Sequence, residues 1–398
     1  MQPTTQPTTQ PTTTAHSARA LRSQGALAVL RHAHAHPSAT RADAARALGL
    51  SSGSAAEITA RLKAARLIEE DAPPRTGGRG RPSPSLVPHP EGPLVCVVDI
   101  SHEGWRVACV ELGGRVVSED AGRHSGTPAV LDDLAERVAD RRALHGRRLR
   151  AVSACVAAAV SGTTVVQASG LGWDDVGLEP LRPPGVPLLV GNDASLAGLA
   201  EARRGAGAGA PVVLHLTVEV GVGGVLVVDG RPIDGATGAG GEFGHLPFGD
   251  PALRCPCGAS GCWDLQVDGR AMARTLGRPA PRDPRTEAER IIAAASSDPA
   301  ASDAVAQAAH ALGRGMGGLV NALDPEVVTL SGLATDLAAT APAALDDGYT
   351  AALMRYRRAA PPPVRPSTLG PRGPLTGAAD AAFDTLLTEA GLDSWNAN

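Results

Sequence analysis

Lysine, cysteine and long apolar segments are scarce in this sequence of 398 residues. Lys63 is the only lysine among 37 basic residues, a bias typical of GC-rich coding sequences that says little about function. No apolar run reaches the length of a membrane-spanning helix, and no basic-then-apolar signal segment opens the chain. We therefore expect a cytoplasmic protein that makes no contact with membranes.

The six cysteines show no disulfide framework of the kind found in small secreted proteins. Cys96, Cys109 and Cys155 are scattered through apolar runs, where a thiol packs as a small hydrophobic group. The other three lie together in the run RCPCGASGCWD at residues 254–264. The cysteine pattern therefore directs attention to that segment.

A histidine precedes these three thiols, and the four side chains have an H-x9-C-x-C-x4-C spacing. They are His245, Cys255, Cys257 and Cys262. One imidazole and three thiolates suit a closed tetrahedral Zn²⁺ site. Gly258 and Gly261 permit the tight turns that bring the last thiol back to the first two. We expect one structural Zn²⁺ per chain in a motif at residues 245–262.

Charge divides the chain into a basic head and an acidic body. Residues 1–90 hold 11 Lys and Arg against 5 Asp and Glu, and the remainder holds 26 against 36. Such a head is expected to meet a polyanion, although a solvated surface bias gives the same count. The chain is too long for one ordinary core, and its N-terminal QPTT repeats are too polar to bury. We therefore predict a disordered tail at 1–16, a basic head at 17–90 and a second domain at 91–398.

The head carries the pattern of a helix-turn-helix. Thr40 can cap a helix over residues 41–48, a short turn follows, and a second helix is predicted over residues 52–64. An ordinary helical hairpin is the alternative. In a DNA-binding motif, the contacts would come from both ends of the second helix. These candidates are Ser51, Ser52, Ser54, Arg61 and Lys63.

A wing is predicted after the second helix. A strand begins at residue 67, the run TGGRGRP follows at residues 76–82, and another strand covers residues 85–87. Arg79 and Arg81 would enter the minor groove or neutralise phosphates, where the glycines let the backbone approach DNA. Helices, wing and positive charge together favour a DNA-binding winged helix-turn-helix domain.

The second domain opens with a three-strand meander at residues 94–117, then a helix at 128–145 and a further strand at 152–160. This order is that of an actin-like, ribonuclease H-like α/β fold. Asn192 and Asp193 end a later strand, where open sheets place ligands, although helix capping alone would explain the Asp. A glycine turn at residues 221–224 could approach a phosphate or simply join two strands.

From about residue 17 to 391 the sequence resembles the ROK family (repressors, open reading frames and kinases), specifically its winged-helix, sugar-responsive regulators. The resemblance rests on the wing, on the run GEFGH at residues 241–245 and on the cysteine spacing. It implies an α/β protein with an N-terminal winged helix-turn-helix and a two-lobed actin-like effector domain of the sugar-kinase type.

The resemblance also implies a sugar site. In the family, an Asn-Asp pair and the Glu and His of a Glu-x-Gly-His motif contact sugar hydroxyls, and the His also ligates zinc. Carried over, and with an Asp in place of the family's Glu after the last cysteine, the sugar-binding residues are Asn192, Asp193, Glu242, His245 and Asp264. In kinase members, the Asp matching Asp193 is the general base.

Several departures from the kinase pattern bear on function. Kinase members carry Asp-x-Gly-Gly-Thr, which cradles the ATP phosphates, whereas this chain has DISHEG at residues 99–104, where Glu103 would repel a triphosphate. Kinase members have a pair of glycines late in the sequence, at the adenosine site, and this chain has Ser331-Gly332 there. A Pro-Gly pair of the family is replaced by alanines at 157–159. Asp264 is one methylene shorter than the usual Glu.

We therefore expect a transcriptional regulator and not an enzyme, most simply a repressor. A sugar or sugar derivative would alter its binding to a double-stranded DNA operator. A homodimer or homotetramer is expected because paired heads read paired half-sites. Two alternatives remain: a ROK sugar kinase with residual ATP-dependent activity, in which Asp193 is catalytic, and a regulator that keeps zinc but has lost sugar binding.

Overall fold

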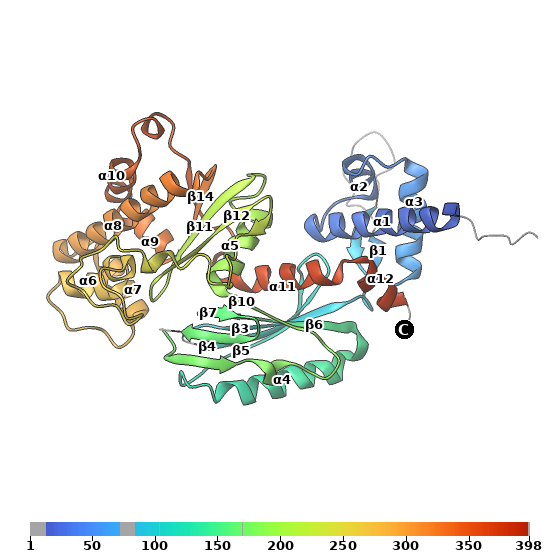
Figure 1. Ribbon diagram of the computed structural model, residues 1–398, viewed down its shortest axis with the longest axis horizontal. Coiled ribbons are helices and arrows are strands. Elements are labelled where there is room, and N and C mark those ends of the chain that lie inside the picture. Colours follow the sequence, from blue (N-terminus) through green and yellow to red (C-terminus); the bar gives the residue numbers. More distant parts are fainter. Residues whose placement is uncertain (1–12, 72–83, 103, 169, 397–398) are drawn as a thin grey trace, which may run out of the picture. The chain divides into compact units, whose positions relative to one another are not determined.

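The computed structural model describes residues 13–71, 84–102, 104–168 and 170–396 (Figure 1). The chain divides into two compact units. Unit 1 comprises Met1–Leu94, Glu111–Arg115 and Phe383–Asn398, and unit 2 comprises Val95–Val110 and Val116–Ala382. Within the described residues, no helix combines the length and apolar character that crossing a membrane requires.

Unit 1 begins with three helices and an antiparallel strand pair. They are α1 (Thr13–Ala35), α2 (Arg41–Ala47), α3 (Ser52–Ala64), β1 (Ile68–Asp71) and β2 (Ser85–Pro88). Thr40 caps α2, and the carboxylate of Asp43 accepts the Thr40 N–H in return, which confirms the predicted helix start. Because α1 begins at Thr13, the last four residues of the predicted disordered tail are helical; residues 1–12 lie outside the described part.

The end of the chain belongs to unit 1. The boundary falls within α11 (Gly373–Leu386), and α12 (Glu389–Asn396) follows. The Trp395 indole donates to the carbonyl of Ala65 at 2.7 Å, and the Arg31 guanidinium donates to the carbonyl of Leu387 at 2.8 Å. Unit 2 thus ends at residue 382, whereas the second domain is predicted to extend to residue 398.

Unit 2 contains two five-stranded sheets (Figure 1). The first comprises β3 (Leu94–Ile100), β4 (Gly104–Glu111), β5 (Val116–Arg123), β6 (Leu149–Val156) and β10 (Leu188–Asn192). The second comprises β11 (Val212–Val218), β12 (Val222–Val228), β13 (Arg231–Pro232), β14 (Val327–Gly332) and β15 (Val364–Pro366).

Both sheets follow one topology. Their orders are β10-β6-β3-β4-β5 and β13-β12-β11-β14-β15, so in each the first strand lies between a meander on one side and the last two strands on the other. Among the described strands, β6 pairs in parallel with β10, β11 with β14 and β14 with β15. One strand order used twice is the two-lobed actin-like α/β architecture that the sequence predicts.

Helices and a small additional sheet complete unit 2. They are α4 (Val130–His145), β7 (Ala159–Ser161), β8 (Thr164–Ala168), β9 (Trp173–Gly177), α5 (Asp193–Arg204), α6 (Gly269–Thr275), α7 (Pro284–Ala294), α8 (Pro299–Leu323), α9 (Leu333–Thr340) and α10 (Pro342–Ala352). Leu134 of α4 packs on the first sheet, and Leu312 and Met316 of α8 belong to the core of the second. Every residue of β3 is buried, as its unbroken apolar run indicates.

Candidate metal and ligand site

The four predicted zinc ligands come together in unit 2. Their donor atoms all lie within 4.8 Å of one another. Cys255 Sγ is 3.8 Å from His245 Nδ1, and Cys257 Sγ is 3.7 Å from Cys262 Sγ. Zn–S bonds of about 2.3 Å and Zn–N bonds of about 2.0 Å place the corners of a tetrahedron roughly 3.5–3.8 Å apart. The cluster therefore fits a metal ion such as Zn²⁺, with Nδ1 as the histidine ligand atom.

Local turns bring the thiols together. The N–H of Cys255 donates to the carbonyl of Ala259 at 2.9 Å, and Gly258 and Gly261 have φ values of +96° and +72°. Residues that carry a side chain rarely adopt such φ values, which confirms the predicted role of the two glycines. Burial and neighbouring thiols raise the pKa of Cys262 to about 12. A bound metal ion reverses this preference, because it coordinates the thiolate.

His245 faces two groups of side chains. Its Nδ1 lies on the cysteine side, whereas its Nε2 is 3.8 Å from Oε2 of Glu242. The imidazole can therefore ligate a metal ion through one nitrogen while the other faces the Glu242 carboxylate. This is the arrangement expected of a histidine shared between a metal and a ligand site.

Asp264 connects the segment that carries the four predicted metal ligands, residues 245–262, to the turn that precedes β12. Its Oδ1 accepts the N–H of Val222 at 2.7 Å, and its Oδ2 lies 3.7 Å from His245 Nδ1. A Cβ on Gly244 would overlap this carboxylate, and one on Gly221 would lie 2.9 Å from Oδ2. These glycines thus make room for a buried Asp264. The turn at residues 219–221 joins antiparallel strands, the second of the two explanations that the sequence allows, and residues 222–224 of the predicted turn belong to β12.

Asn192, and not its neighbour, caps α5. Its Oδ1 accepts the N–H of Ser195 at 2.9 Å, while its Nδ2 donates to the carbonyl of Ala158 and to Asp193 Oδ1 at 3.1 and 3.2 Å. Both polar atoms of the Asn192 amide are therefore hydrogen-bonded within the protein, and its Nδ2 orients the Asp193 carboxylate. Asp193 also contacts the start of the helix, because its Oδ1 accepts the N–H of Ala194 at 2.8 Å.

A group of acidic side chains surrounds Asp193. Burial, and then the negative charges of Asp99 and Glu242, raise the pKa of Asp193 to about 7. Burial also raises the pKa of Glu242 and of Asp99, and the Cys155 thiol donates to Asp99 Oδ1 at 3.2 Å. Carboxyl groups of this kind can exchange hydrogen bonds with hydroxyl groups of a ligand. Asp99 lies near the end of β3, as Asp193 follows β10, but its place beside Asp193 was not predicted from the sequence.

Two backbone N–H groups of the turn after β3 are bonded within the turn itself. The N–H of Ser101 donates to the carbonyl of Gly104 at 2.9 Å, and the N–H of Gly104 donates to Ser101 Oγ at 3.2 Å. These backbone donors are engaged within the turn. Glu103 lies outside the described residues. At the late glycine position, the Ser331 hydroxyl is bonded to buried His215, at 3.1 Å from Nε2.

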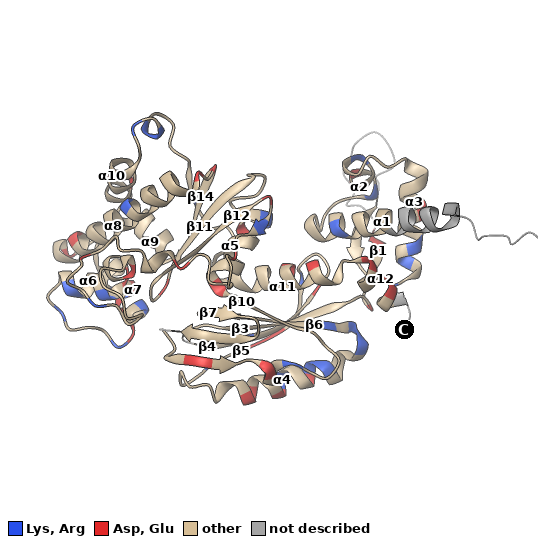
Figure 2. Cartoon of the chain, viewed as in Figure 1, with Lys and Arg blue, Asp and Glu red and all other residues tan. Residues whose placement is uncertain are grey.

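The predicted DNA-contacting residues of α3 are all exposed. Ser51 caps the helix and accepts the N–H of Ser54, and Ser52 follows it. Figure 2 shows Lys and Arg on the helices of unit 1. Lys63 forms an ion pair with Glu70 at 3.0 Å. Arg79 and Arg81 lie outside the described residues.

Comparison with known proteins identifies relatives of two kinds. The family model described as "ROK family" matches residues 97–384. A glucokinase of Streptomyces coelicolor is 28% identical over 313 residues, which cover 73% of this chain and 97% of the glucokinase. A putative xylose repressor of Caldicellulosiruptor is 29% identical over 186 residues, 43% of this chain and 47% of that protein.

Solved structures include both kinds as well. A ROK family transcriptional regulator, described as a homologue of the E. coli MLC protein, has a TM-score of 0.73 at 22% identity and covers 94% of this chain and 99% of its own. A ROK family glucokinase from Streptomyces griseus, in complex with glucose and AMPPNP, has a TM-score of 0.63 at 27% identity, covering 73% and 99%. At 22% identity, the first match establishes the fold alone.

Proposed function

The chain belongs to the ROK family, and from this premise we propose that it is a transcriptional regulator whose binding to operator DNA is modulated by a sugar. The observation that carries the proposal is coverage. The regulator structure covers 94% of the chain, whereas the glucokinase structure covers 73%. Residues before 97 lie outside the family match, and they hold α1, α2, α3 and the β1–β2 pair of unit 1.

In this proposal, residues 17–90 form a winged helix-turn-helix. α2 and α3 are joined by a short turn, and the connection between β1 and β2 is the wing. Ser51, Ser52 and Ser54 would meet phosphates at the start of α3, and Arg61 would contact DNA from its other end. Arg79 and Arg81 would reach DNA from the wing. Because Lys63 is paired with Glu70, we expect it to contribute less to DNA binding than Arg61.

The acidic group and His245 form the proposed sugar site. Glu242 and Asp193 would hold sugar hydroxyls, and His245 would donate from Nε2 while Nδ1 binds the metal. Asn192 and Asp264 would act by orienting these groups, because their own polar atoms are bonded to the protein. Glucose in the S. griseus structure supports a hexose-like effector. A Zn²⁺ ion held by His245 and the three cysteines would cross-link the wall of the site and fix the His245 ring.

Calorimetric titration with a panel of hexoses, amino sugars and pentoses tests this site. One member of the panel should bind, and Glu242→Gln should weaken that binding by about tenfold or more, because hydrogen bonds from hydroxyl groups to a charged carboxylate are stronger than those to an amide. Absence of binding by any sugar would instead favour a regulator that keeps the metal and has lost the sugar. Exposed Glu389→Gln on α12 is a matched control and should bind normally.

A sugar kinase is the second candidate, and one observation favours it. A carboxyl with a pKa of about 7, as at Asp193, is well suited to removing a proton from a hydroxyl near neutral pH. The turn after β3 argues against a kinase, because the N–H groups of Ser101 and Gly104 are already hydrogen-bonded within it. Sugar-dependent formation of ADP from ATP, abolished by Asp193→Asn, would decide for the kinase.

A further inference from the structure

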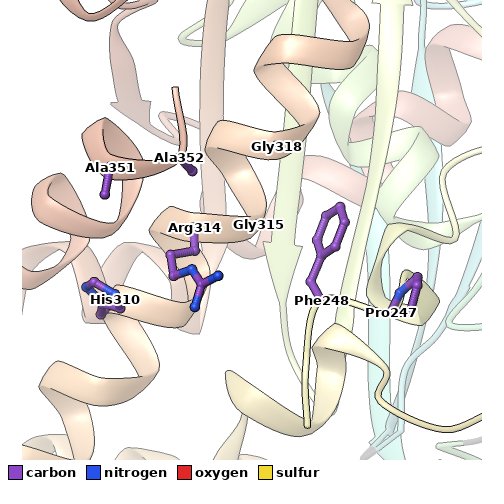
Figure 3. A pocket seen from close by; sticks show the side chains of 8 residues that line it. All are labelled: Pro247, Phe248, His310, Arg314, Gly315, Gly318, Ala351 and Ala352. Atoms are coloured by element: carbon purple, nitrogen blue, oxygen red, sulfur yellow. The ribbon is translucent and has the colours of Figure 1, made fainter. Parts of the chain in front are cut away.

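Two features of unit 2 lie outside the proposed metal and sugar sites. One is a cavity of about 570 Å³ beside helices α8 and α10, lined among others by Phe248, His310 and Arg314 (Figure 3). Its lining mixes an aromatic ring with charged and small side chains, and this mixture selects no single class of ligand. The other feature is a pair of thiols in the first sheet, Cys96 and Cys109, whose arrangement does select a chemistry.

The two cysteines lie opposite each other on neighbouring strands. Cys96 belongs to β3 and Cys109 to β4, and a short turn joins these strands. The N–H of Ser101 donates to the carbonyl of Gly104 at 2.9 Å, which makes these two residues directly opposed. Five steps back along β3 and five steps forward along β4 lead from them to the two cysteines. Hydrogen-bonded and non-hydrogen-bonded pairs alternate in an antiparallel ladder, so the cysteines form a non-hydrogen-bonded pair, in which side chains are closest.

The geometry of this pair suits a disulfide. Opposed residues of a non-hydrogen-bonded pair have Cα atoms about 4.5 Å apart, and disulfides span about 4.4–6.8 Å between Cα atoms. The two thiols are hydrogen-bonded to each other, so both side chains lie on the same face of the sheet. Val98 and Val107, two residues along each strand on that face, belong to the core that this sheet shares with α4. A bond between the two sulfur atoms therefore requires little movement of either strand.

The two thiols differ in acidity. The hydrogen bond with the Cys96 thiol lowers the pKa of Cys109 to about 7, even though burial opposes this shift. The Ser118 hydroxyl, directly opposite on β5, and the positive charges of Arg141 and Arg148 act in the same direction. A thiolate is the form that attacks an oxidant. Cys109 is therefore the sulfur that reacts first, and its neighbour is the thiol that can close the bond.

The pair lies beside an irregular part of the sheet and close to both strand crossings between the units. The register of β4 on β5 shifts between Cys109 and Val110, and such a shift weakens the ladder locally. This gives a small oxidant access to sulfurs that are otherwise buried. Leu94 and Glu111, which belong to unit 1, are two residues from Cys96 and Cys109. A disulfide would thus join β3 and β4 where each strand continues into unit 1.

We propose that Cys96 and Cys109 form a reversible thiol–disulfide site that hydrogen peroxide oxidises. The Cys109 thiolate attacks one peroxide oxygen, the O–O bond breaks, and the hydroxide that leaves takes up a proton to become water. The Cys96 sulfur then attacks the sulfur of the resulting sulfenic acid. The S–O bond breaks, and the second hydroxide leaves as water with the Cys96 proton. Two thiols have then lost two hydrogen atoms, and one peroxide has become two water molecules.

Peptide mapping of the full chain after treatment with hydrogen peroxide and alkylation of free thiols in denaturant tests the proposal. Trypsin cuts after Arg106, between the two cysteines, so they leave in separate peptides unless a disulfide joins them. The joined peptides should be found in roughly half of the molecules or more, and dithiothreitol should separate them. In Cys96→Ala, the sulfenic acid of Cys109 should persist and react with dimedone.

Cys155 of β6 is the matched control. It is as fully buried in the same sheet, but its thiol donates to Asp99, which strand alternation places on the other face from Cys96. Because it has no opposed thiol on that face among the described residues, Cys155 should remain a free thiol under the same treatment.

Two results would overturn the proposal. One is that Cys96 and Cys109 both remain free thiols at peroxide concentrations that oxidise the cysteines of the metal cluster. The other is a chain in which Cys155 is oxidised to the same extent, since oxidation would then follow from unfolding and not from the pairing of the thiols. The readout is the chemical state of identified peptides, so none of these results bears on sugar or operator binding.

Discussion

Asp193 shows how neighbouring groups change the chemistry of a single residue. An ordinary aspartate is ionised above pH 4, but burial and the charges of Asp99 and Glu242 raise the pKa of this one to about 7. Near neutral pH it is therefore divided between an acid, which donates a hydrogen bond, and a carboxylate, which accepts one. Either form can bind a hydroxyl group.

Asp193→Asn should change the pH dependence of stability. Between pH 4 and about 7 the folded chain binds more protons at this site than the unfolded chain, so wild-type stability falls as pH rises through that window. Asparagine does not titrate. The melting temperature of the variant minus that of the wild type should therefore increase from pH 4.5 to 7 and then level off. A constant difference across these pH values would contradict the assigned pKa.

Cys257→Ser should remove the metal and the sugar response together. The thiol is one of four converging ligands, and the loop that they hold positions His245 beside Glu242. Metal analysis should find about one Zn²⁺ per chain in the wild type and almost none in the variant. Cys109→Ala, a buried thiol outside the cluster, should keep its zinc. Normal sugar binding by a metal-free Cys257→Ser would contradict this coupling.

The sequence predicted the metal ligands and several of the acidic residues near them, but not the contacts that these residues make. His245 and the three cysteines could be found because their spacing is local and their chemistry is specific. The contact of Asp264 with Val222, and the approach of Asp99 to Asp193, join segments that are distant in sequence. Such contacts follow from tertiary packing, which no local pattern records.

At the scale of elements, glycine lets α8 and α10 pack closely. A Cβ on Gly313 would overlap the carbonyl oxygen of Leu345 and lie 2.7 Å from the backbone nitrogen of Tyr349. Both atoms belong to the backbone of α10 and cannot move aside as a side chain can. Gly318 of the same helix differs, since its nearest neighbours are atoms of the Phe248 ring at 3.5 Å.

Gly313→Ala should therefore lower the free energy of unfolding by about 1–3 kcal/mol, the usual cost of overpacking. Gly318→Ala should leave it unchanged or raise it by up to about 1 kcal/mol, because alanine favours the helix and the methyl group fits. Urea denaturation of both variants provides the comparison. Equal effects of the two substitutions would show that α8 and α10 are not packed as described.

The element boundaries were predictable where a local signal marks them. Thr40 and Ser51 cap α2 and α3, and both helices begin where the sequence predicts. The assignment of residues 383–398 to unit 1 was not predicted. That assignment depends on contacts such as Trp395 with Ala65, which are 330 residues apart.

At the scale of the whole molecule, the fold of the family is combined with a second unit. Unit 2 repeats one strand order in two sheets. It carries the four candidate metal ligands and the neighbouring acidic side chains of Asp99, Asp193 and Glu242. Unit 1 holds the chain's N-terminal helices and its last helix. Regulation in the proposed account requires that a sugar bound in unit 2 change the affinity of unit 1 for DNA, which is a coupling between two sites.

Selection of duplexes from a random DNA library by the full chain, followed by anisotropy titrations with and without the sugar that binds, measures this coupling directly. The account predicts an enriched sequence with two half-sites and a change of about tenfold or more in its dissociation constant when the sugar is added. A chain that enriches no duplex, and that forms ADP from ATP only when sugar is present, would contradict the account and identify a kinase.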